Sequence, residues 1–216
     1  MRRLLCAFVC VVSLGTTGKA QRAPIEFNWW DANDLLRQLL VAIDPARPEN
    51  IYMPQLLREK IAWVFSENKA GRLILNFSPS PQRDRNGKEN RGALMDATKN
   101  QSGALVNIYA GTLMYFVRYK RGVRQGFDEV SKDGFALSLA HEAIHLEQPL
   151  SFFLDRNFHP EEEDRAWRTC IIQIIRPMRA SGRKMELDRH KEADDILRRC
   201  HDRPSCPDFV AFITRS

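Results

Sequence analysis

Apolar residues recur at helical spacing in two segments near the start of the chain. In the first, Asp31 is a suitable N-cap, and the pattern predicts a helix over 31–43 that ends before Pro45 and Pro48. Its apolar positions are Leu35, Leu36, Leu39, Leu40 and Ile43. A second helix is predicted to begin near Pro54, because proline is favoured in a first helical turn. Its apolar side carries Leu56, Leu57, Ile61, Ala62, Val64 and Phe65.

The middle of the chain carries strand patterns. Short apolar runs rich in β-formers predict strands over 73–77 and 104–109. Between them, 78–92 is polar and rich in turn residues, which predicts a long exposed loop. The run over 112–119 fits either a helix or a strand, and the charged, glycine-containing segment 120–132 is expected to be a connection.

Helical patterns return in the second half of the chain. Asp133 is a reasonable N-cap for a helix that opens with mostly apolar residues. Another helix is predicted to begin at Pro160 and to end at Pro177. A charged helix with a thin apolar stripe is predicted over 185–199, and the apolar run 209–213 should pack back against the domain.

This order of elements predicts an α+β fold: a single, mainly helical domain over 21–216 with a small sheet before its central helix. Residues 1–20 look like a secretory signal peptide, because Arg2 and Arg3 precede a short apolar core and a small-residue site ends at Ala20. The apolar run is too short to span a bilayer. We therefore expect a secreted or periplasmic protein with no stable membrane insertion after signal cleavage.

Charge changes this picture little. Removing the signal segment takes away Arg2, Arg3 and Lys19, which lowers the formal net charge from +6 to +3. The remaining basic residues are mixed with acidic ones and form no stripe. No nucleic-acid partner is therefore expected.

The cysteines allow two disulfide pairings. Cys170, Cys200 and Cys206 remain after signal cleavage, and an oxidising compartment favours one disulfide among them. Either Cys200 pairs with Cys206 and leaves Cys170 free, or Cys170 pairs with Cys200.

A short motif, His141-Glu142-Ala143-Ile144-His145, indicates metal chemistry. Histidines four residues apart lie on one face of a helix, so both imidazoles reach one metal ion. Glu142 sits about 100° round the helix, where it holds a water without ligating the metal. A histidine-rich metzincin site is excluded, because Gln148 and Ser151 stand where that pattern needs glycine and histidine. The alternative is an ordinary amphipathic helix that carries the motif by chance.

A catalytic zinc ion takes three protein ligands and leaves one position to water. The best candidate for the third ligand lies in the segment 160–167, where Pro160 is followed by three glutamates. A carboxylate-rich first turn also suits the positive end of a helix dipole, which explains at least some of these charges. His159, 14 residues after His145, is another candidate ligand.

The segment over roughly 104–176 resembles compact zincin metallopeptidases of the gluzincin kind. The resemblance is carried by a strand, a short element, a connection and then the sequence Phe-Ala-Leu-Ser-Leu-Ala-His-Glu-Ala-Ile-His. In gluzincins the third ligand is a glutamate on the next helix, often followed three residues later by alanine. Glu163 and Ala166 match this pattern. The resemblance thus implies Glu163 as the third ligand, with Glu162 as the second choice.

The resemblance also implies a function, a zinc-dependent metallopeptidase that cleaves peptide bonds in a peptide or protein substrate. Zn²⁺ bound to His141, His145 and Glu163 would activate a water. Glu142 would act as the catalytic general base.

Other roles follow from the same resemblance. His159 or a tyrosine would donate a hydrogen bond to the developing oxyanion. Asp155 and Asp164 would hold the free nitrogens of the liganding histidines. The strand over 104–109 is expected to be an edge strand that binds extended peptide backbone. Two alternatives remain: a catalytically inactive zinc-binding protein and a non-enzymatic exported helical binding protein.

Overall fold

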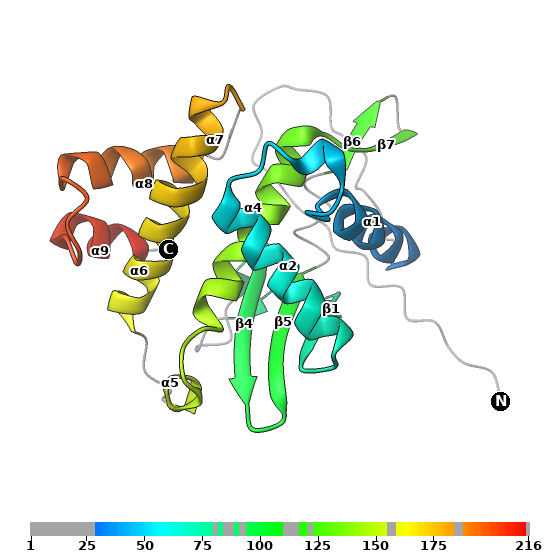
Figure 1. Cartoon of the computed structure of the whole chain (residues 1–216), viewed down its shortest axis with the longest axis horizontal. Helices are drawn as coiled ribbons and strands as arrows, with labels where there is room; N and C mark the ends of the chain where they lie inside the picture. Colours follow the sequence, from blue (N-terminus) through cyan, green and yellow to red (C-terminus); the bar gives the residue numbers. More distant parts are fainter. Residues whose placement is uncertain are drawn as a thin grey trace.

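The computed structural model describes residues 29–79, 82–83, 89–90, 94–109, 117–120, 123–154, 159–183 and 188–214. The described chain is a single α+β domain, mostly helical, with a small three-stranded sheet, as the sequence predicts (Figure 1). The predicted signal peptide lies outside these residues. Within them, no helix combines the length and the apolar character that crossing a membrane requires.

The first two predicted helices are confirmed. They are α1 (Trp29–Ala42) and α2 (Gln55–Lys69), with a short 3₁₀ helix, η1 (Pro48–Asn50), between them. Leu35, Leu39 and Leu57 from these helices are fully buried. The predicted N-cap is wrong, because α1 begins two residues before Asp31.

Three strands form the main sheet: β1 (Leu73–Ser78), β4 (Met95–Asn100) and β5 (Gly103–Tyr109). The strand order is β1-β5-β4, with β1 parallel and β4 antiparallel to β5. The predicted strands over 73–77 and 104–109 are therefore confirmed. The prediction that 104–109 is an edge strand is wrong, because β5 pairs on both sides and the edge strands are β1 and β4.

A tight approach fixes the start of β5. Gly103 has a φ of +146°, and a Cβ there would lie 2.8 Å from the backbone oxygen of Arg72. The Asn100 side chain accepts hydrogen bonds from the backbone N–H groups of Ser102 and Gly103, which closes the turn from β4. Glycine is therefore the residue that this turn accommodates without strain.

Two smaller sheets lie in segments for which no strand was firmly predicted. They pair β2 (Gln82–Arg83) with β3 (Glu89–Asn90), and β6 (Val117–Lys120) with β7 (Val123–Phe127). Residues 117–119 are thus strand, whereas 112–116 lie outside the described residues. The prediction that 120–132 is only a connection is wrong, since it holds β7 and the start of a helix.

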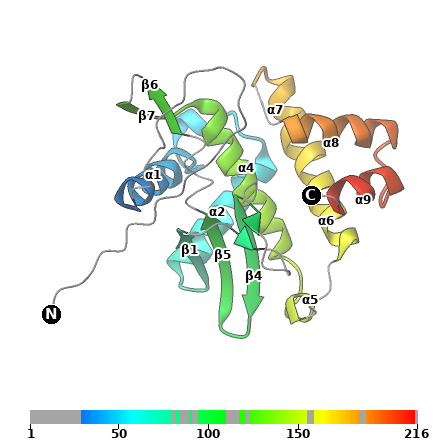
Figure 2. The ribbon, with the colours of Figure 1, turned by 180° about the vertical axis from the view of Figure 1, so that it is seen from behind.

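The helices of the second half are α4 (Glu129–His145), α5 (Leu150–Leu154), α6 (Pro160–Cys170), the π-helix η3 (Ile171–Ile175), α7 (Arg176–Ala180), α8 (Asp188–Arg199) and α9 (Pro207–Thr214). Helix α4 lies at the centre of the fold, with α2 on one side and α6 on another (Figures 1 and 2). It is buried along most of its length, which agrees with its apolar sequence.

The predicted start of α4 at Asp133 is wrong. The true N-cap is Asp128, whose carboxylate accepts the backbone N–H of Ser131 at 2.8 Å. Asp133 lies inside the helix, 1% exposed, and accepts hydrogen bonds from the Tyr52 hydroxyl at 2.6 Å and from Arg183 at 2.8 Å. The Arg183 guanidinium also covers the Tyr52 ring at 3.9 Å. This buried cluster ties the first half of α4 to the segments before α2 and after α7.

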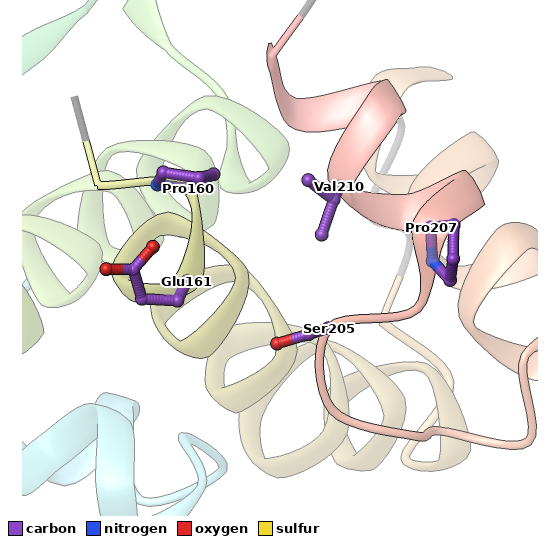
Figure 3. A pocket seen from close by; sticks show the side chains of 5 residues that line it. All are labelled: Pro160, Glu161, Ser205, Pro207 and Val210. Atoms are coloured by element: carbon purple, nitrogen blue, oxygen red, sulfur yellow. The ribbon is translucent and has the colours of Figure 1, made fainter.

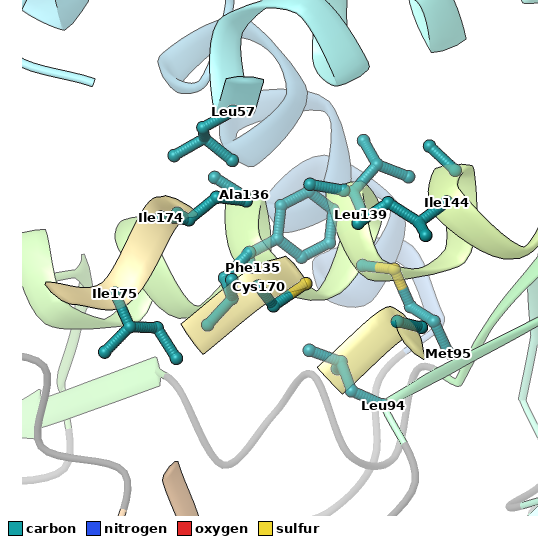
Figure 4. Packing of buried hydrophobic residues seen from close by; sticks show 14 of the residues in the cluster. Leu57, Leu94, Met95, Phe135, Ala136, Leu139, Ile144, Cys170, Ile174 and Ile175 are labelled. Atoms are coloured by element: carbon teal, nitrogen blue, oxygen red, sulfur yellow. The ribbon is translucent and has the colours of Figure 1, made fainter. Parts of the chain in front are cut away.

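Side chains from α2, β4, α6 and η3 pack around α4, as Figure 4 shows. Phe135, Leu139 and Ile144 of α4 form the middle of this core, with Met95 of β4 against them. Cys170 at the end of α6 is also in the core and carries a free, buried thiol. Helices α4 and α6 therefore share one continuous packed interface.

The helix that begins at Pro160 does not end at Pro177, so that prediction is wrong. It runs through η3 into α7, with the amide of Arg176 bonded to the carbonyl of Ile171. Pro177 then falls in the first turn of α7, where a missing N–H is tolerated. The wide π turn thus lets one long helix line the core.

Helices α8 and α9 cover the side of α6 that faces away from α4 (Figures 1 and 2). Arg176 bridges this layer, because it donates to Asp194 of α8 at 2.7 Å and to Asp202 at 2.7 Å. Cys200 and Cys206 form the disulfide between α8 and α9, which is one of the two pairings that the sequence allows.

We expect Cys206→Ser to destabilise the fold by about 2 kcal/mol, because the disulfide closes a short loop and restricts the unfolded chain. Equilibrium urea unfolding measures the effect. The unmutated protein under reducing conditions is the control and should match the variant. Equal stability of the oxidised protein and the variant would contradict this account.

Candidate metal centre

Three predicted ligands meet where α4 packs against α6. His141 and His145 lie one turn apart in the last part of α4, and Glu163 lies in the first turn of α6. Their Nε2 and carboxylate oxygen atoms all lie within 4.8 Å of one another, and each side chain is partly buried. The structure thus brings together the three residues that the sequence selects.

The distances between the ligand atoms are short. The Nε2 atoms of His141 and His145 are 3.0 Å apart. One carboxylate oxygen of Glu163 lies 3.6 Å from His141 Nε2, and the other lies 3.2 Å from His145 Nε2. Two ligand atoms at about 2.0–2.1 Å from a tetrahedral zinc ion lie about 3.3 Å apart. The three side chains therefore fit a zinc ion in both spacing and chemical type.

The electrostatics of the cluster favour a cation. Burial lowers the pKa of His141, but contacts with Cys170 and Glu163 outweigh it and raise this pKa well above its usual value. Burial likewise lowers the pKa of His145, and contacts with Glu162 and Glu163 raise it by more. Burial raises the pKa of Glu163, but the two histidines lower it below its usual range. Positive charge is thus stabilised where the rings and the carboxylate meet.

Glu162 is buried beside the cluster and is not one of the three candidate ligands. Its carboxylate accepts from Gln148 at 2.7 Å and from two nitrogens of Arg165 at 2.8 and 2.6 Å. One of its oxygens faces His145 Nδ1 at 3.6 Å. Burial raises the pKa of Glu162, but His145 and Arg165 lower it to about 2, so the carboxylate is ionised. A carboxylate on this side favours the tautomer of His145 that leaves Nε2 free for a metal.

The other two ligands also have a partner on α6. Cys170 Sγ lies 3.8 Å from His141 Nδ1, the nitrogen opposite the cluster. The indole N–H of Trp167 donates to a Glu163 carboxylate oxygen at 2.8 Å. Neither residue was singled out from the sequence as a neighbour of the ligands. The spacing in the sequence could have identified them, because positions 163, 167 and 170 lie on one face of a helix.

The supporting role expected of Asp164 is not met, because Glu162 and Cys170 face the Nδ1 atoms of the two histidines. Asp164 accepts from Arg168 at 2.8 Å and from the backbone N–H of Ser205 at 3.2 Å. It therefore serves the contact between α6 and the segment before α9, away from the histidine rings. Asp155 lies outside the described residues.

The end of α4 that bears the motif is held by two cations. Lys99 of β4 donates to the carbonyl oxygens of Leu146 and Gln148 at 3.3 and 3.1 Å. Arg165 of α6 donates to the carbonyl oxygen of Ile144 at 3.0 Å. Cations at the C-terminal end of a helix satisfy free carbonyl groups and complement the helix dipole. The last turn of α4, and with it His145, is thereby fixed to the sheet and to α6.

Glu142 lies beside the cluster without belonging to it. Burial raises its pKa, both histidines lower it, and the carboxylates of Glu163 and Asp96 raise it further. Asp96 is on β4 and accepts hydrogen bonds from the Tyr109 hydroxyl and from Asn107. Glu142 therefore lies near the edge strand of the sheet as well as near the histidines.

His159 does not join the three ligands in the described part of the chain. It occupies the N-cap position of α6, and its ring lies against Phe152 with centroids 4.6 Å apart. Its Nδ1 faces a carboxylate oxygen of Glu161 at 3.4 Å. The role of His159 as an oxyanion donor stays a prediction.

A hollow of about 310 Å³ lies on another side of α6, towards α9 (Figure 3). It is lined by Pro160, Glu161, Ser205, Pro207 and Val210. None of these residues belongs to the group of His141, His145 and Glu163. The hollow is therefore separate from the metal centre.

We expect Glu162→Gln to weaken zinc binding about tenfold, because glutamine keeps the shape of the side chain but loses the charge that faces His145. Competition with a chromogenic chelator measures the affinity. Glu161→Gln is the matched control, since Glu161 is the preceding carboxylate and its side chain is 67% exposed. An equal change in both variants, or none in either, would contradict the assigned role of Glu162.

Comparison with protein-family models, with curated proteins and with solved structures finds no match for this chain. The case for the candidate centre therefore depends on its own residues. These are the H-E-x-x-H spacing on α4 and the convergence of His141, His145 and Glu163.

Proposed function

We propose that this protein is an exported zinc-dependent hydrolase, specifically a metallopeptidase. The observation that carries the proposal is the convergence of ligand atoms from His141, His145 and Glu163 within 4.8 Å, with Glu142 beside them. The export part of the proposal rests on the sequence of residues 1–20.

The three side chains would hold one Zn²⁺ ion with two imidazole nitrogens and one carboxylate oxygen, a donor set typical of catalytic zinc. When bound, zinc acts as a Lewis acid and lowers the pKa of a water from ~15.7 towards ~7. Glu162 and Trp167 orient His145 and Glu163 through the contacts described above. Three protein ligands would leave a position for water, which a structural site with four ligands lacks.

Glu142 would move the proton. It follows His141 directly on α4, and its charge interacts with both histidines and with Glu163. In this position it would accept a proton from the attacking water and pass it to the nitrogen of the departing amine. A purely structural metal site has no need of a carboxylate that does not bind the metal.

The edge strand β4 supports an extended peptide as the substrate. Among the described residues β4 pairs with β5 on one side only, and its Asp96 influences Glu142. An extended peptide can add to such an edge through main-chain hydrogen bonds. β5, the strand to which the sequence assigned this role, is enclosed on both sides, and of the two edge strands β1 and β4 it is β4 that carries Asp96, whose charge acts on Glu142.

The first test is the zinc content of the purified mature chain. We expect about one zinc ion per chain, and loss of that zinc in His145→Ala and Glu163→Ala, because each removes one of three ligands. Glu142→Gln should keep the zinc and lower peptidase activity at least about 100-fold, as loss of a general base does. A library of fluorogenic peptides measures the activity, with Glu161→Gln as control.

Each alternative has its own outcome. A chain that binds zinc but hydrolyses no peptide before or after Glu142→Gln would be a catalytically inactive zinc-binding protein. A chain without zinc, even after reconstitution, would be a non-enzymatic binding protein that carries the motif by chance.

A further inference from the structure

We propose that Trp167 is a positioning residue for the third ligand and that its indole N–H fixes the carboxylate of Glu163 for metal binding. The proposal rests on the proposed zinc site and goes beyond it, because it assigns a role to a residue that neither the motif nor the glutamate pattern includes.

The hydrogen bond from Trp167 gives the two carboxylate oxygens of Glu163 different partners. Trp167 Nε1 donates to Oε1 of Glu163 at 2.8 Å, and Oε2 of the same carboxylate is 3.2 Å from His145 Nε2. An indole nitrogen is a donor only, so it cannot compete with the carboxylate for a cation. The indole thus holds the oxygen that faces His141 Nε2 at 3.6 Å, while the other oxygen points to His145.

The indole ring is itself held between aromatic neighbours. Its edge meets the His141 ring, with centroids 5.6 Å apart and planes at 70°. Beyond it lie His190 of α8 and Phe212 of α9, with centroid distances of 5.1 and 6.1 Å. Phe212 is only 7% exposed. Helices α8 and α9 therefore supply aromatic side chains that pack against the Trp167 ring.

The hydrogen bond between Trp167 and Glu163 lowers the entropic cost of binding a metal. A glutamate side chain has several rotatable bonds, and fixing it in one orientation costs conformational entropy. A donor that already holds the carboxylate in the folded protein meets that cost before the metal binds. Trp167 thus preorganises the site through its N–H group, and its ring serves mainly for packing.

The test compares Trp167→Phe with Trp63→Phe. Phenylalanine keeps an aromatic ring and removes the donor, whereas Trp63 lies on α2 and is 37% exposed. We expect Trp167→Phe to weaken Zn²⁺ binding about tenfold, as loss of an outer hydrogen bond to a ligand does. The visible absorption spectrum of the Co²⁺-substituted protein should also change, since it reports on ligand geometry. Trp63→Phe should alter neither.

A measurement without metal separates this proposal from the proposed function. In the metal-free protein, the indole N–H resonance of Trp167 should move in Glu163→Ala and stay in place in Glu161→Gln. Thermal unfolding of metal-free Trp167→Phe identifies any general loss of structure.

The outcomes are distinct. Zinc binding by the parent protein with unchanged affinity and an unchanged Co²⁺ spectrum in Trp167→Phe would overturn the positioning role and leave the zinc site intact. A parent protein that binds no zinc would overturn the proposed function together with any positioning role for metal. In that case the indole resonance still decides whether the bond between Trp167 and Glu163 exists.

Discussion

The packing of α4 against α6 is the contact on which the rest of this structure depends. Each helix brings an incomplete part of the candidate centre, two imidazoles from one and one carboxylate from the other. Polar groups that leave water must find partners within the protein. The interface meets this requirement with a chain of contacts in which each ligand has a further partner on α6. Apolar packing around Phe135 and Cys170 then holds the two helices together.

The same constraint explains the layers around these helices. Lys99 and Arg165 hold the carbonyl groups at the end of α4, while the buried Asp133 cluster holds its first half. On the far side of α6, α8 and α9 press Phe212 and His190 against Trp167. Elements without a candidate ligand thus contribute by limiting how the ligand-bearing helices move. The candidate metal centre therefore lies among packed helices and not on a surface loop.

Much of the fold was accessible from the sequence, because local patterns carry it. Helical periodicity located α1 and α2, and apolar β-rich runs located β1 and β5. The pattern failed for β4, whose sequence Met-Asp-Ala-Thr-Lys-Asn is mostly polar, as an edge strand permits. It also failed at Pro177, where a π turn lets the helix continue.

The sequence by itself determined the spacing of His141, Glu142 and His145, since four residues on a helix fix which side chains share a face. It also narrowed the candidates for the third ligand to Glu163, Glu162 and His159. Only the tertiary structure decided that the Glu163 carboxylate lies beside both histidines, while the Glu162 carboxylate faces the Nδ1 atom of His145. It alone brought Trp167 and Cys170 to the ligands and made β4 the edge strand. The reason is physical: a helix repeat sets positions within one element, whereas the angle and depth at which two helices pack depend on side chains from the whole core.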